Sequence, residues 1–265
     1  MPLSPIAARY DQFIVDLDGC VWIGDEPTPG AVEALSAVRE AGKRVAFATN
    51  DPRSATEDYV TRLWRLGLKA SLRDVVTVGG AVQHLLAETR SGRTAFVIGT
   101  PSLRRHVADA GLKLLNGTDL ASRADVVVVA GTEDFVYDDL RDASLAIRRG
   151  ADFIATGRDP TYPQPDGLWP GTGAIVAAVE YATGRTAEVV GKPQPQLLRT
   201  ALDRLGDGRT LVVGDRVDTD LAAAAAAKLD AALVLTGEAT RSDADGLEPK
   251  PVAIADTLAS LLTKG

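Results

Sequence analysis

The sequence predicts an α/β protein built around a parallel sheet. Apolar runs of strand length alternate along the chain with segments of helical period, and this alternation is typical of strand–helix–strand units. Polar and acidic residues follow several of the apolar runs, at the ends where parallel strands place their ligand sites. Of the 265 residues, 45% are hydrophobic and 25% are charged, which is the composition of a globular protein.

The first predicted strand is the apolar run at 13–15, and it leads into Asp16-Leu17-Asp18-Gly19. Side chains alternate along a strand, so Asp16 and Asp18 would lie on one face if the strand continued. Two carboxylates at the end of a buried strand are costly unless a cation neutralises them. The pair is therefore a candidate for Mg²⁺ binding, for covalent catalysis by a carboxylate, or for both. The alternative is a turn capped by an aspartate.

Polar residues also end the next predicted strand, which covers residues 44–50. Thr49 and Asn50 are its last residues, and Asp51 begins a turn. A hydroxyl, an amide and the backbone N–H groups of such a strand end can hold a phosphate group. The alternative for Thr49 and Asn50 is an ordinary turn.

Capping and stop signals place the remaining elements. Thr28 and Pro29 supply an N-cap and a first-turn proline for a helix that continues to Arg39, and Gly42 and Gly67 end two helices. The other predicted elements are a helix at 54–66, strands at 94–99 and 125–130, a helix at 137–149 and a strand at 153–156.

Two later fragments carry further polar groups after apolar residues. Lys192 follows a short apolar pair, and its compact charge suits a phosphate or a phosphoaspartate, although most lysines are merely solvated. The apolar run at 210–213 leads into Gly214 and Asp215, with further acids up to Asp220. Mg²⁺ prefers hard oxygen ligands, so carboxylates from separate strand ends would suffice. The alternative for Asp220 is a cap of the alanine helix that follows.

In this order the fragments resemble the four motifs of the haloacid dehalogenase-like (HAD) hydrolases. The similar segments are Asp16-Leu17-Asp18-Gly19, Thr49-Asn50, Lys192 and the residues 214–220. The blocks 170–174, 191–193 and 234–237 are similar to those of subfamily IIA, which contains NagD-like, p-nitrophenylphosphatase-like and phosphoglycolate phosphatase-like enzymes. The resemblance implies a Rossmann-like core with an inserted α/β cap domain of the C2 type.

The spacing of the motifs places the insertion. Only a short loop separates Asp18 from the predicted helix start at Thr28, whereas a long gap separates Thr49 from Lys192. We therefore expect a core domain formed by residues 1–77 and 187–265, and a cap domain formed by residues 78–186.

The resemblance implies a Mg²⁺-dependent phosphatase that acts on a small phosphorylated metabolite through an aspartyl phosphate. Asp16 would be the nucleophile, Asp18 the general acid and base, and Lys192 the group that cancels charge repulsion. The phosphoryl oxygens would be held by Thr49 and by backbone amides of Asn50 and Asp51. The Mg²⁺ site would be formed by Asp16, the backbone carbonyl of Asp18, Asp215 and, beside these ligands, Asp220.

Three expectations concern the surroundings of this site. The subfamily usually has asparagine where this chain has Asp51, and we expect the extra carboxylate to pair with Arg53. In the cap, Arg158, Asp159 and Tyr162 are expected to line the leaving-group side, where Arg158 would favour a second anionic group. The alternative for these three residues is a solvated proline-rich turn. Cys20 is expected to be a small packing residue.

Bulk properties limit the partners. The net charge of −7 argues against sequence-independent binding of nucleic acid, which needs a basic surface. The single cysteine excludes an internal disulfide and fits a reducing compartment. The N-terminal residues do not have the pattern of a signal peptide, and no apolar stretch has the length of a membrane helix. We expect a cytoplasmic protein without a membrane partner; a homodimer through the cap is implied at family level.

Other functions with the same residues stay open at this stage. A phosphotransferase or phosphomutase would transfer the group to an alcohol faster than to water. A phospho-acceptor switch would keep a long-lived phosphoaspartate, although the chain is about twice the size of a receiver domain and Asp18 supplies a group for turnover. A silent binding protein is disfavoured because every expected catalytic residue is present. The sequence does not identify the substrate.

Overall fold

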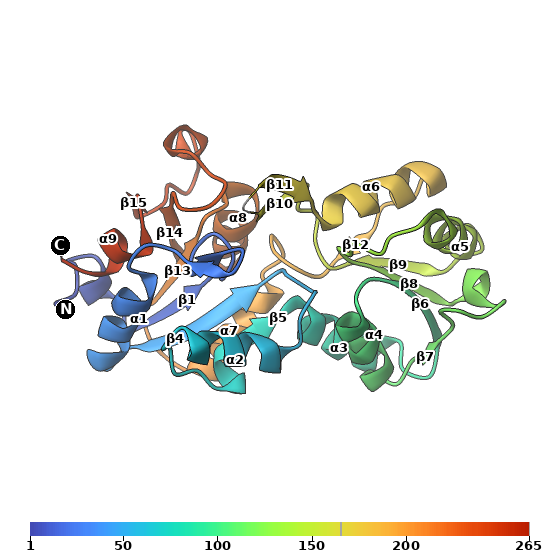
Figure 1. Ribbon diagram of the computed structural model, residues 1–265, viewed down its shortest axis with the longest axis horizontal. Helices are drawn as coiled ribbons and strands as arrows, with labels where there is room; N and C mark the ends of the chain where they lie inside the picture. The colour runs from blue at the N-terminus through green and yellow to red at the C-terminus, as the bar shows by residue number, and fades with distance from the viewer. Residues whose placement is uncertain (165, 265) are drawn as a thin grey trace.

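The computed structural model describes residues 1–164 and 166–264 and contains two parallel β-sheets, one in each half of the molecule (Figure 1). The first sheet has the strand order β15-β14-β13-β1-β4-β5, and the second has the order β12-β9-β8-β6-β7. Neighbouring strands are parallel throughout both sheets. The predicted α/β class with a parallel sheet is confirmed.

The strands of the first sheet are β1 (Gln12–Val15), β4 (Arg44–Thr49), β5 (Val75–Thr77), β13 (Thr210–Gly214), β14 (Asp230–Val234) and β15 (Ala253–Ala255). Those of the second are β6 (Thr94–Ile98), β7 (Lys113–Leu114), β8 (Val126–Val129), β9 (Asp152–Ala155) and β12 (Glu188–Val189). Two short antiparallel hairpins are formed by β2 (Trp22–Ile23) with β3 (Glu26–Pro27), and by β10 (Thr161–Gln164) with β11 (Gly167–Pro170).

Helices cover both faces of the first sheet because its buried strands are apolar on both sides. Phe13 and Val15 of β1 pack with the helices α1 (Ala31–Glu40), α2 (Thr56–Arg65) and α9 (Leu258–Leu262). Ile14, which points to the opposite face, packs with α7 (Gln196–Leu205) and α8 (Ala222–Ala227). This arrangement follows from the alternation of side chains along a strand.

The second sheet is covered in the same way. Phe96 of β6 packs with α5 (Tyr137–Arg148) and α6 (Thr172–Thr183) on one face. Val97, its neighbour in sequence, packs on the other face with α3 (Val78–Thr89) and α4 (Pro101–Asp109). Figure 1 shows these two pairs of helices on opposite sides of the sheet. Each half of the molecule is therefore a three-layer α/β arrangement with its own core.

The predicted domain boundary at residue 187 does not coincide with the boundary between the sheets. Glu188 and Val189 form β12, which pairs with β9 and so belongs to the second sheet. The chain crosses to the second half through α3, in which Val78 packs with the first core and Val82 with the second. It returns after β12. The division into a core and an inserted cap stays a prediction, with its second crossing moved past Val189.

The first predicted helix begins later than expected. The structure starts α1 at Ala31, and Gly30 precedes it in the left-handed region with φ 69°. Thr28, the expected N-cap, instead donates its hydroxyl to the backbone oxygen of Cys20 at 2.5 Å. Thr28 therefore fixes the loop that follows β1, and the helix begins without a side-chain cap. The predicted helix stops are confirmed, because Gly42 and Gly67 both have positive φ.

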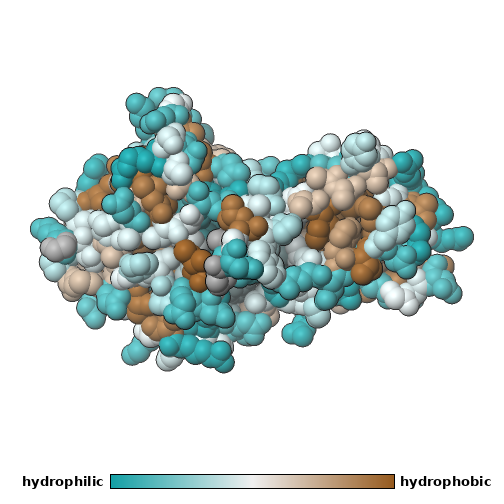
Figure 2. Space-filling model, turned by 45° about the horizontal axis from the view of Figure 1, so that its top comes forward, coloured by the Kyte–Doolittle hydropathy of each residue, from teal (hydrophilic) through white to brown (hydrophobic). Residues whose placement is uncertain are grey.

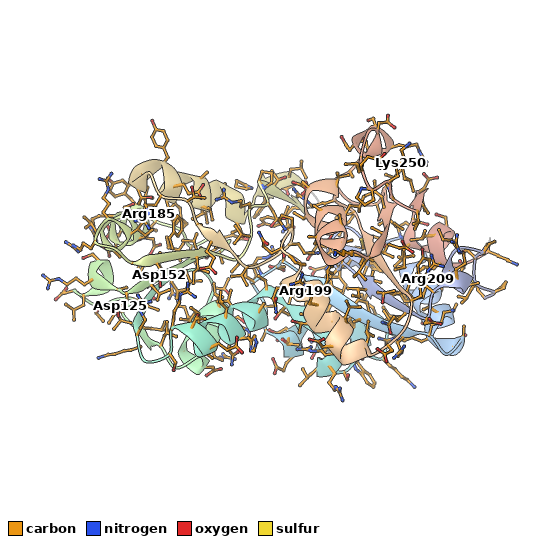
Figure 3. All side chains as sticks on the ribbon, turned by 180° about the vertical axis from the view of Figure 1, so that it is seen from behind. Asp125, Asp152, Arg185, Arg199, Arg209 and Lys250 are labelled. Carbon is orange, nitrogen blue, oxygen red and sulfur yellow. The ribbon has the colours of Figure 1, made fainter. Side chains whose placement is uncertain are left out.

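The outer edge of the second sheet is held by ion pairs. Asp152 lies at the start of β9, in the half that carries the second sheet (Figure 3). It accepts hydrogen bonds from Arg90 and Arg93 at 3.1 and 2.6 Å. Arg90 also reaches Glu188 of the neighbouring strand at 2.8 Å. Since parallel strands begin at the same edge of a sheet, these pairs connect the starts of β9 and β12.

Exposed apolar side chains are found at a few places on the surface. Figure 2 shows hydrophobic side chains near the middle of the molecule and on the half that carries the second sheet. Leu168 and Trp169 of the β10–β11 hairpin are 62% and 37% exposed. Within residues 1–164 and 166–264, no helix combines the length and the apolar character needed to cross a membrane.

Two leucines test the packing of the first core. Leu63 of α2 is fully buried, whereas Leu72 is 51% exposed. Leu63→Ala should lower the free energy of unfolding by about 2–5 kcal/mol, because the removed atoms leave a cavity. Leu72→Ala should change it by less than about 1 kcal/mol. Urea unfolding followed by circular dichroism measures both values, and equal losses would contradict the assignment of Leu63 to the core.

Candidate active site

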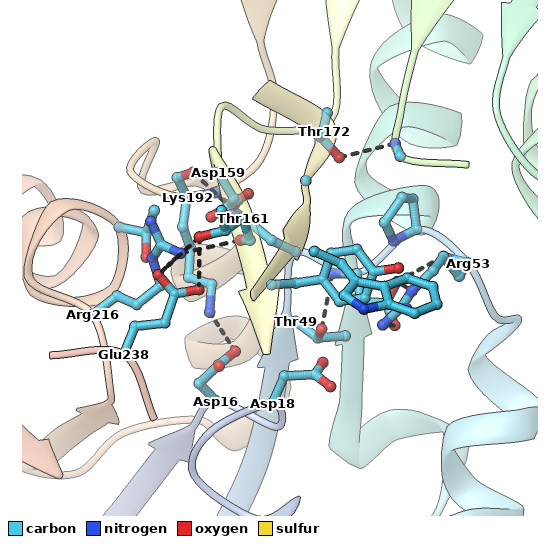
Figure 4. Close-up of a pocket in the computed structure, with 18 of the residues that line it drawn as sticks. Asp16, Asp18, Thr49, Arg53, Asp159, Thr161, Thr172, Lys192, Arg216 and Glu238 are labelled. Atoms are coloured by element: carbon cyan, nitrogen blue, oxygen red, sulfur yellow. Dashed lines mark hydrogen bonds and ion pairs between the residues drawn. The ribbon is translucent and has the colours of Figure 1, made fainter. Parts of the chain in front are cut away.

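A cavity of about 370 Å³ lies at the carboxyl ends of β1, β4 and β13, next to the β10–β11 hairpin (Figure 4). Parallel strands bring their carboxyl ends to one edge, so residues far apart in sequence meet there. The predicted site residues that line it are Asp16, Asp18, Thr49, Asn50, Asp51, Tyr162, Lys192, Asp215 and Asp220. The structure therefore brings together all the predicted site residues except Arg158.

Lys192 is the centre of a buried charge network. Its Nζ donates to Asp16 Oδ1 at 2.5 Å, to Asp220 Oδ1 at 2.6 Å and to the backbone oxygen of Ala48 at 3.1 Å. Lys192 is only 3% exposed. Burial lowers the pKa of Lys192, but the charges of Asp16 and Asp220 outweigh burial and raise it above its usual range. The side chain is a fixed cation beside Asp16.

Both carboxylate oxygens of Asp220 accept hydrogen bonds, one of them from Lys192. Its Oδ1 accepts from Lys192, and its Oδ2 accepts the backbone N–H of Arg216 at 3.1 Å. One π-helical turn after β13 (Val217–Leu221) brings Asp220 back against Gly214, where a Cβ would lie 2.1 Å from that of Asp220. Only glycine at 214 allows this approach. The place of Asp220 beside the metal ligands stays a prediction.

Asp16 and Asp215 form a second cluster with Cys20. Their oxygen atoms and the sulfur of Cys20 lie within 4.8 Å of one another. Asp215 is 2% exposed and accepts the backbone N–H of Glu238 at 3.0 Å; no ion pair of Asp215 is found in the part of the chain that the structure describes. Burial is the main cause that raises the pKa of Asp215, to about 7, and the charge of Asp220 is the second. A buried carboxylate without a cation is a position suited to a metal ion.

Glycines leave room for Asp215. A Cβ on Gly237 would lie 1.8 Å from Asp215 Oδ2, and one on Gly19 would lie 2.4 Å from it. Cys20 is fully buried within the first core, as expected of a packing residue, and burial raises the pKa of its thiol well above the usual value. Two loops therefore close tightly around the carboxylate of Asp215.

Asp18 points to a different side of the cavity floor. Its Oδ1 accepts the indole N–H of Trp22 at 3.1 Å, and Trp22 stacks on Tyr59 with parallel rings 6.4 Å apart. Burial, and then the nearby charge of Asp51, raise the pKa of Asp18 to about 6. Trp22 and Tyr59 were not predicted as site residues, because a tryptophan and a tyrosine 37 positions apart carry no motif.

Asn50 connects the strand end of β4 to the loop of Lys192. Its side chain accepts the backbone N–H of Lys192 at 2.7 Å and donates to the backbone oxygen of Lys192 at 2.9 Å. Thr49 Oγ1 accepts the backbone N–H of Asp51 at 2.9 Å. The carboxamide of Asn50 is thus engaged with the protein, and the hydroxyl proton of Thr49 is free to be donated into the cavity.

Asp51 pairs with Arg53, as expected from the sequence. Arg53 Nε donates to Asp51 Oδ1 at 2.7 Å, and Arg53 Nη2 donates to Asp51 Oδ2 at 3.1 Å. The guanidinium also lies over the ring of Tyr162, 4.4 Å from its centre. Trp169 meets Tyr162 edge to face at 6.3 Å. Arg53, Tyr162 and Trp169 form a wall at the mouth of the cavity.

The opposite wall carries the charged groups of Arg216 and Glu238, which were not among the predicted site residues. Arg216 Nη1 pairs with Glu238 Oε2 at 2.7 Å (Figure 4), and Arg216 also pairs with Asp218. Asp159, from the loop before β10, lines the cavity as expected from the sequence, and burial raises its pKa. Glu238 directly follows the block at 234–237, so its closeness to a motif was the only signal in the sequence.

The prediction for Arg158 is wrong. Its two terminal nitrogens, Nη1 and Nη2, donate hydrogen bonds to the carboxylate of Glu180 in α6. The side chain does not line the cavity and is 42% exposed. Arg158 pairs with Glu180 because a carboxylate that accepts two parallel hydrogen bonds binds a guanidinium more strongly than water in an open cavity does. The preference for a second anionic group that was expected from Arg158 has no basis at that position.

The arrangement supports one type of chemistry. A carboxylate held by a buried ammonium, with a second carboxylate ready for a metal ion, suits attack on a polyanionic centre. A neighbouring carboxyl with a pKa near 6 can give up or take a proton near neutral pH. A hydroxyl and backbone N–H groups at the same strand ends can hold a phosphate group.

Comparison with known proteins agrees with this chemistry. A family model described as haloacid dehalogenase-like hydrolase matches residues 13–113, and one described as HAD-hydrolase-like matches residues 189–261. The chain is 41% identical to the D-glycerol 3-phosphate phosphatase of Mycobacterium tuberculosis, over 98% of this chain and 73% of that protein. It is 30% identical to an acid sugar phosphatase of Staphylococcus aureus, over 92% of this chain and 93% of that protein.

Solved structures show the same similarity. The crystal structure of the Mycobacterium tuberculosis glycerol phosphate phosphatase in complex with magnesium matches with a TM-score of 0.88, at 41% identity, over 99% of this chain and 79% of that one. NagD from Escherichia coli K-12 matches with a TM-score of 0.81, at 29% identity, over 94% and 97% of the two chains.

The buried network of Lys192 predicts a loss of stability when the cation is removed. Lys192→Met should lower the free energy of unfolding by about 3–5 kcal/mol, because two buried carboxylates lose their shared partner. Lys250→Met is the control, because Lys250 is exposed; it should change stability by less than about 0.5 kcal/mol. Urea unfolding without added divalent cations measures both. Unchanged stability of the Lys192 variant would show that Asp16 and Asp220 need no cation.

Proposed function

The chain belongs to the haloacid dehalogenase-like hydrolases, as a member of subfamily IIA, and we propose that it hydrolyses small phosphate monoesters with Mg²⁺ through an aspartyl phosphate. Its relatives in this family are named as phosphatases, and the chain is accordingly a phosphoric monoester hydrolase. The observation that carries the proposal is the ion pair between Lys192 and Asp16, next to the buried carboxylate of Asp215.

The cluster at Asp16 fits a magnesium ion. Asp16 and Asp215 would hold it with their side chains, and Asp18 with its backbone carbonyl. Two carboxylates and a carbonyl are hard oxygen donors, and Mg²⁺ keeps water in its remaining positions. The bound ion would neutralise charge on the phosphoryl oxygens. The neutral thiol of Cys20 is a soft group and is not needed as a ligand.

Asp16 is proposed as the nucleophile. Its Oδ1 is fixed by Lys192, which leaves the other oxygen to attack phosphorus in line. The bond between that oxygen and phosphorus forms as the ester bond to the leaving oxygen breaks. A carboxylate and a phosphate repel each other, and Lys192 reduces the repulsion without reorganising, because Asp220 and Ala48 hold it in place.

Asp18 is proposed as the group that moves protons. In its protonated form it gives its proton to the leaving alkoxide. It then takes a proton from the water that attacks the aspartyl phosphate, which releases inorganic phosphate and restores Asp16. The pKa of about 6 makes both forms accessible near neutral pH. The indole N–H of Trp22 holds Oδ1, so Oδ2 faces the reaction.

Thr49 is proposed to hold a phosphoryl oxygen together with backbone N–H groups. Its Oγ1 already accepts from the N–H of Asp51, so its hydroxyl proton is available to the phosphate. The backbone N–H of Asp51 therefore orients the Thr49 hydroxyl instead of binding the phosphate itself. The carboxamide of Asn50 is engaged with Lys192, and we assign it the task of positioning that residue.

The relatives indicate which substrates to test first. One is named as a phosphatase of D-glycerol 3-phosphate and another as an acid sugar phosphatase. Glycerol phosphate and sugar phosphates are therefore our first candidates. The position of Asp18 beside Asp16 favours turnover over a long-lived phosphoaspartate switch. The cytoplasmic location and the homodimer through the cap stay predictions.

Release of inorganic phosphate tests the proposed function. The purified protein should release phosphate from p-nitrophenyl phosphate and glycerol 3-phosphate with Mg²⁺, and EDTA should abolish the reaction. Asp16→Asn should reduce kcat by at least about 10³-fold, because the nucleophile is lost while the shape of the site is kept. Transfer to an added alcohol that exceeds hydrolysis would instead support a phosphotransferase. Activity that persists in the Asp16 variant would overturn the mechanism.

The glycine beside Asp215 gives a test of the metal site that does not depend on turnover. Gly237→Ala should weaken Mg²⁺ binding by about 10- to 100-fold, because the new methyl displaces the Asp215 carboxylate. Gly80→Ala in α3 is the control, since its new Cβ would meet ordinary contact distances of 3.5 Å. Isothermal titration calorimetry measures both, and an unchanged affinity in the Gly237 variant would exclude Asp215 as a ligand.

A further inference from the structure

We propose that the Asp51–Arg53 ion pair makes this phosphatase select substrates with an uncharged, hydroxyl-bearing leaving group over those whose leaving group carries a carboxylate or a second phosphate. The inference rests on the proposed function and adds the class of substrate to it. Asp51 would be the specificity-determining residue, through its effect on Arg53.

The ion pair engages two of the guanidinium nitrogens of Arg53, Nε and Nη2. Both carboxylate oxygens of Asp51 accept from the guanidinium, and Asp51 Oδ1 also accepts the backbone N–H of Arg53 at 3.0 Å. The two side chains are 14% and 31% exposed, so water screens the pair only in part. A guanidinium stays charged, and its fork is the group best suited to bind an external carboxylate or phosphate. Here an internal carboxylate occupies that fork.

Within the part of the chain that the structure describes, the rest of the leaving-group region offers no unpaired cation that could replace Arg53. Arg216, on the opposite wall, is paired with Glu238 at 2.7 Å and with Asp218 at 3.1 Å. Glu133 and Asp159 also line the cavity. Among the described residues that line the cavity, apart from Asp16, Asp18, Asp215 and Asp220, carboxylates therefore outnumber guanidinium groups. An anionic leaving group would meet net negative charge there.

The same region suits carbon-bound hydroxyl groups. Tyr162 lies under the guanidinium, and Trp169 meets it edge to face, which gives an aromatic surface for C–H groups. Hydroxyl groups can donate to the carboxylates of Asp51 and Asp159, both at the cavity surface. A short polyol or a sugar, esterified with one phosphate, combines these two features. The chemistry that the cavity recognises is thus a neutral polyol phosphate.

Two matched substrates test the inference. Glycerol 3-phosphate and 3-phosphoglycerate share a three-carbon skeleton and differ at one end, where a carboxylate replaces a hydroxymethyl group. The wild-type kcat/KM should favour glycerol 3-phosphate by at least about tenfold, because one unfavourable charge interaction in a partly buried site has that size. p-Nitrophenyl phosphate serves as the reference for general activity.

Asp51→Asn should move this ratio toward 3-phosphoglycerate by about tenfold or more, because Arg53 then lacks its internal partner. Arg53→Gln should move it in the opposite direction, because the carboxylate of Asp51 is then unpaired. In the double variant, the shift of the ratio toward 3-phosphoglycerate that Asp51→Asn causes should disappear. Asp142→Asn is the matched control, since Asp142 pairs with Arg141 on the surface of α5; it should leave the ratio unchanged.

The outcomes distinguish failure of the substrate preference from failure of the phosphatase function. A wild-type preference for 3-phosphoglycerate, or equal ratios in wild type and in both single variants, would overturn the inference while the phosphatase function stands. If Asp51→Asn does not fold, the opposite shift expected of Arg53→Gln decides alone. Absence of Mg²⁺-dependent release from p-nitrophenyl phosphate by the wild type would overturn the proposed function, and the inference with it.

Discussion

The ammonium group of Lys192 between Asp16 and Asp220 is the interaction on which the site depends. Two buried carboxylates would repel each other and would lose the hydration that stabilises their charge. Lys192 neutralises the charge of both carboxylates and donates a hydrogen bond to each. The backbone oxygen of Ala48, on the neighbouring strand, accepts its third hydrogen bond. The close approach of Asp220 to Gly214 allows this geometry, because any larger residue would fill the space. A charged group that is fixed in this way needs no rearrangement during a reaction.

The two halves of the molecule meet at this network. Asn50, at the end of β4, bonds to the backbone of Lys192 in the segment that returns from the second sheet. Its side-chain nitrogen also lies 3.5 Å from Asp159, in the loop that leads to the β10–β11 hairpin. One amide thus ties together the floor of the cavity, the lysine and the loop above it. The loops of the second half can therefore shape the leaving-group region without supplying the groups on the floor.

The leaving-group region shows how local pairing changes what a cavity recognises. Arg53 and Arg216 would each be strong anion ligands if they were free. Both are instead held by carboxylates, Arg53 by Asp51 of its own loop and Arg216 by Glu238 of a neighbouring loop. Arg158, which the sequence suggested for this role, is held by Glu180 away from the cavity. Binding of the phosphate and selection of the leaving group therefore rely on different residues.

The sequence by itself determined the α/β class, the strand ends that carry Asp16, Thr49 and Asp215, and the pair of Asp51 with Arg53, because periodicity and short-range pairing are local properties. It placed the start of α1 too early and assigned Glu188 and Val189 to the core domain, since a hydrogen bond within the loop after β1 and a partner strand in the second sheet decide those positions. Only the tertiary structure could decide that Trp22 holds Asp18, that Glu238 faces Arg216 and that Arg158 turns away. Those contacts join side chains that no spacing rule connects, and each depends on how loops from separate strands converge.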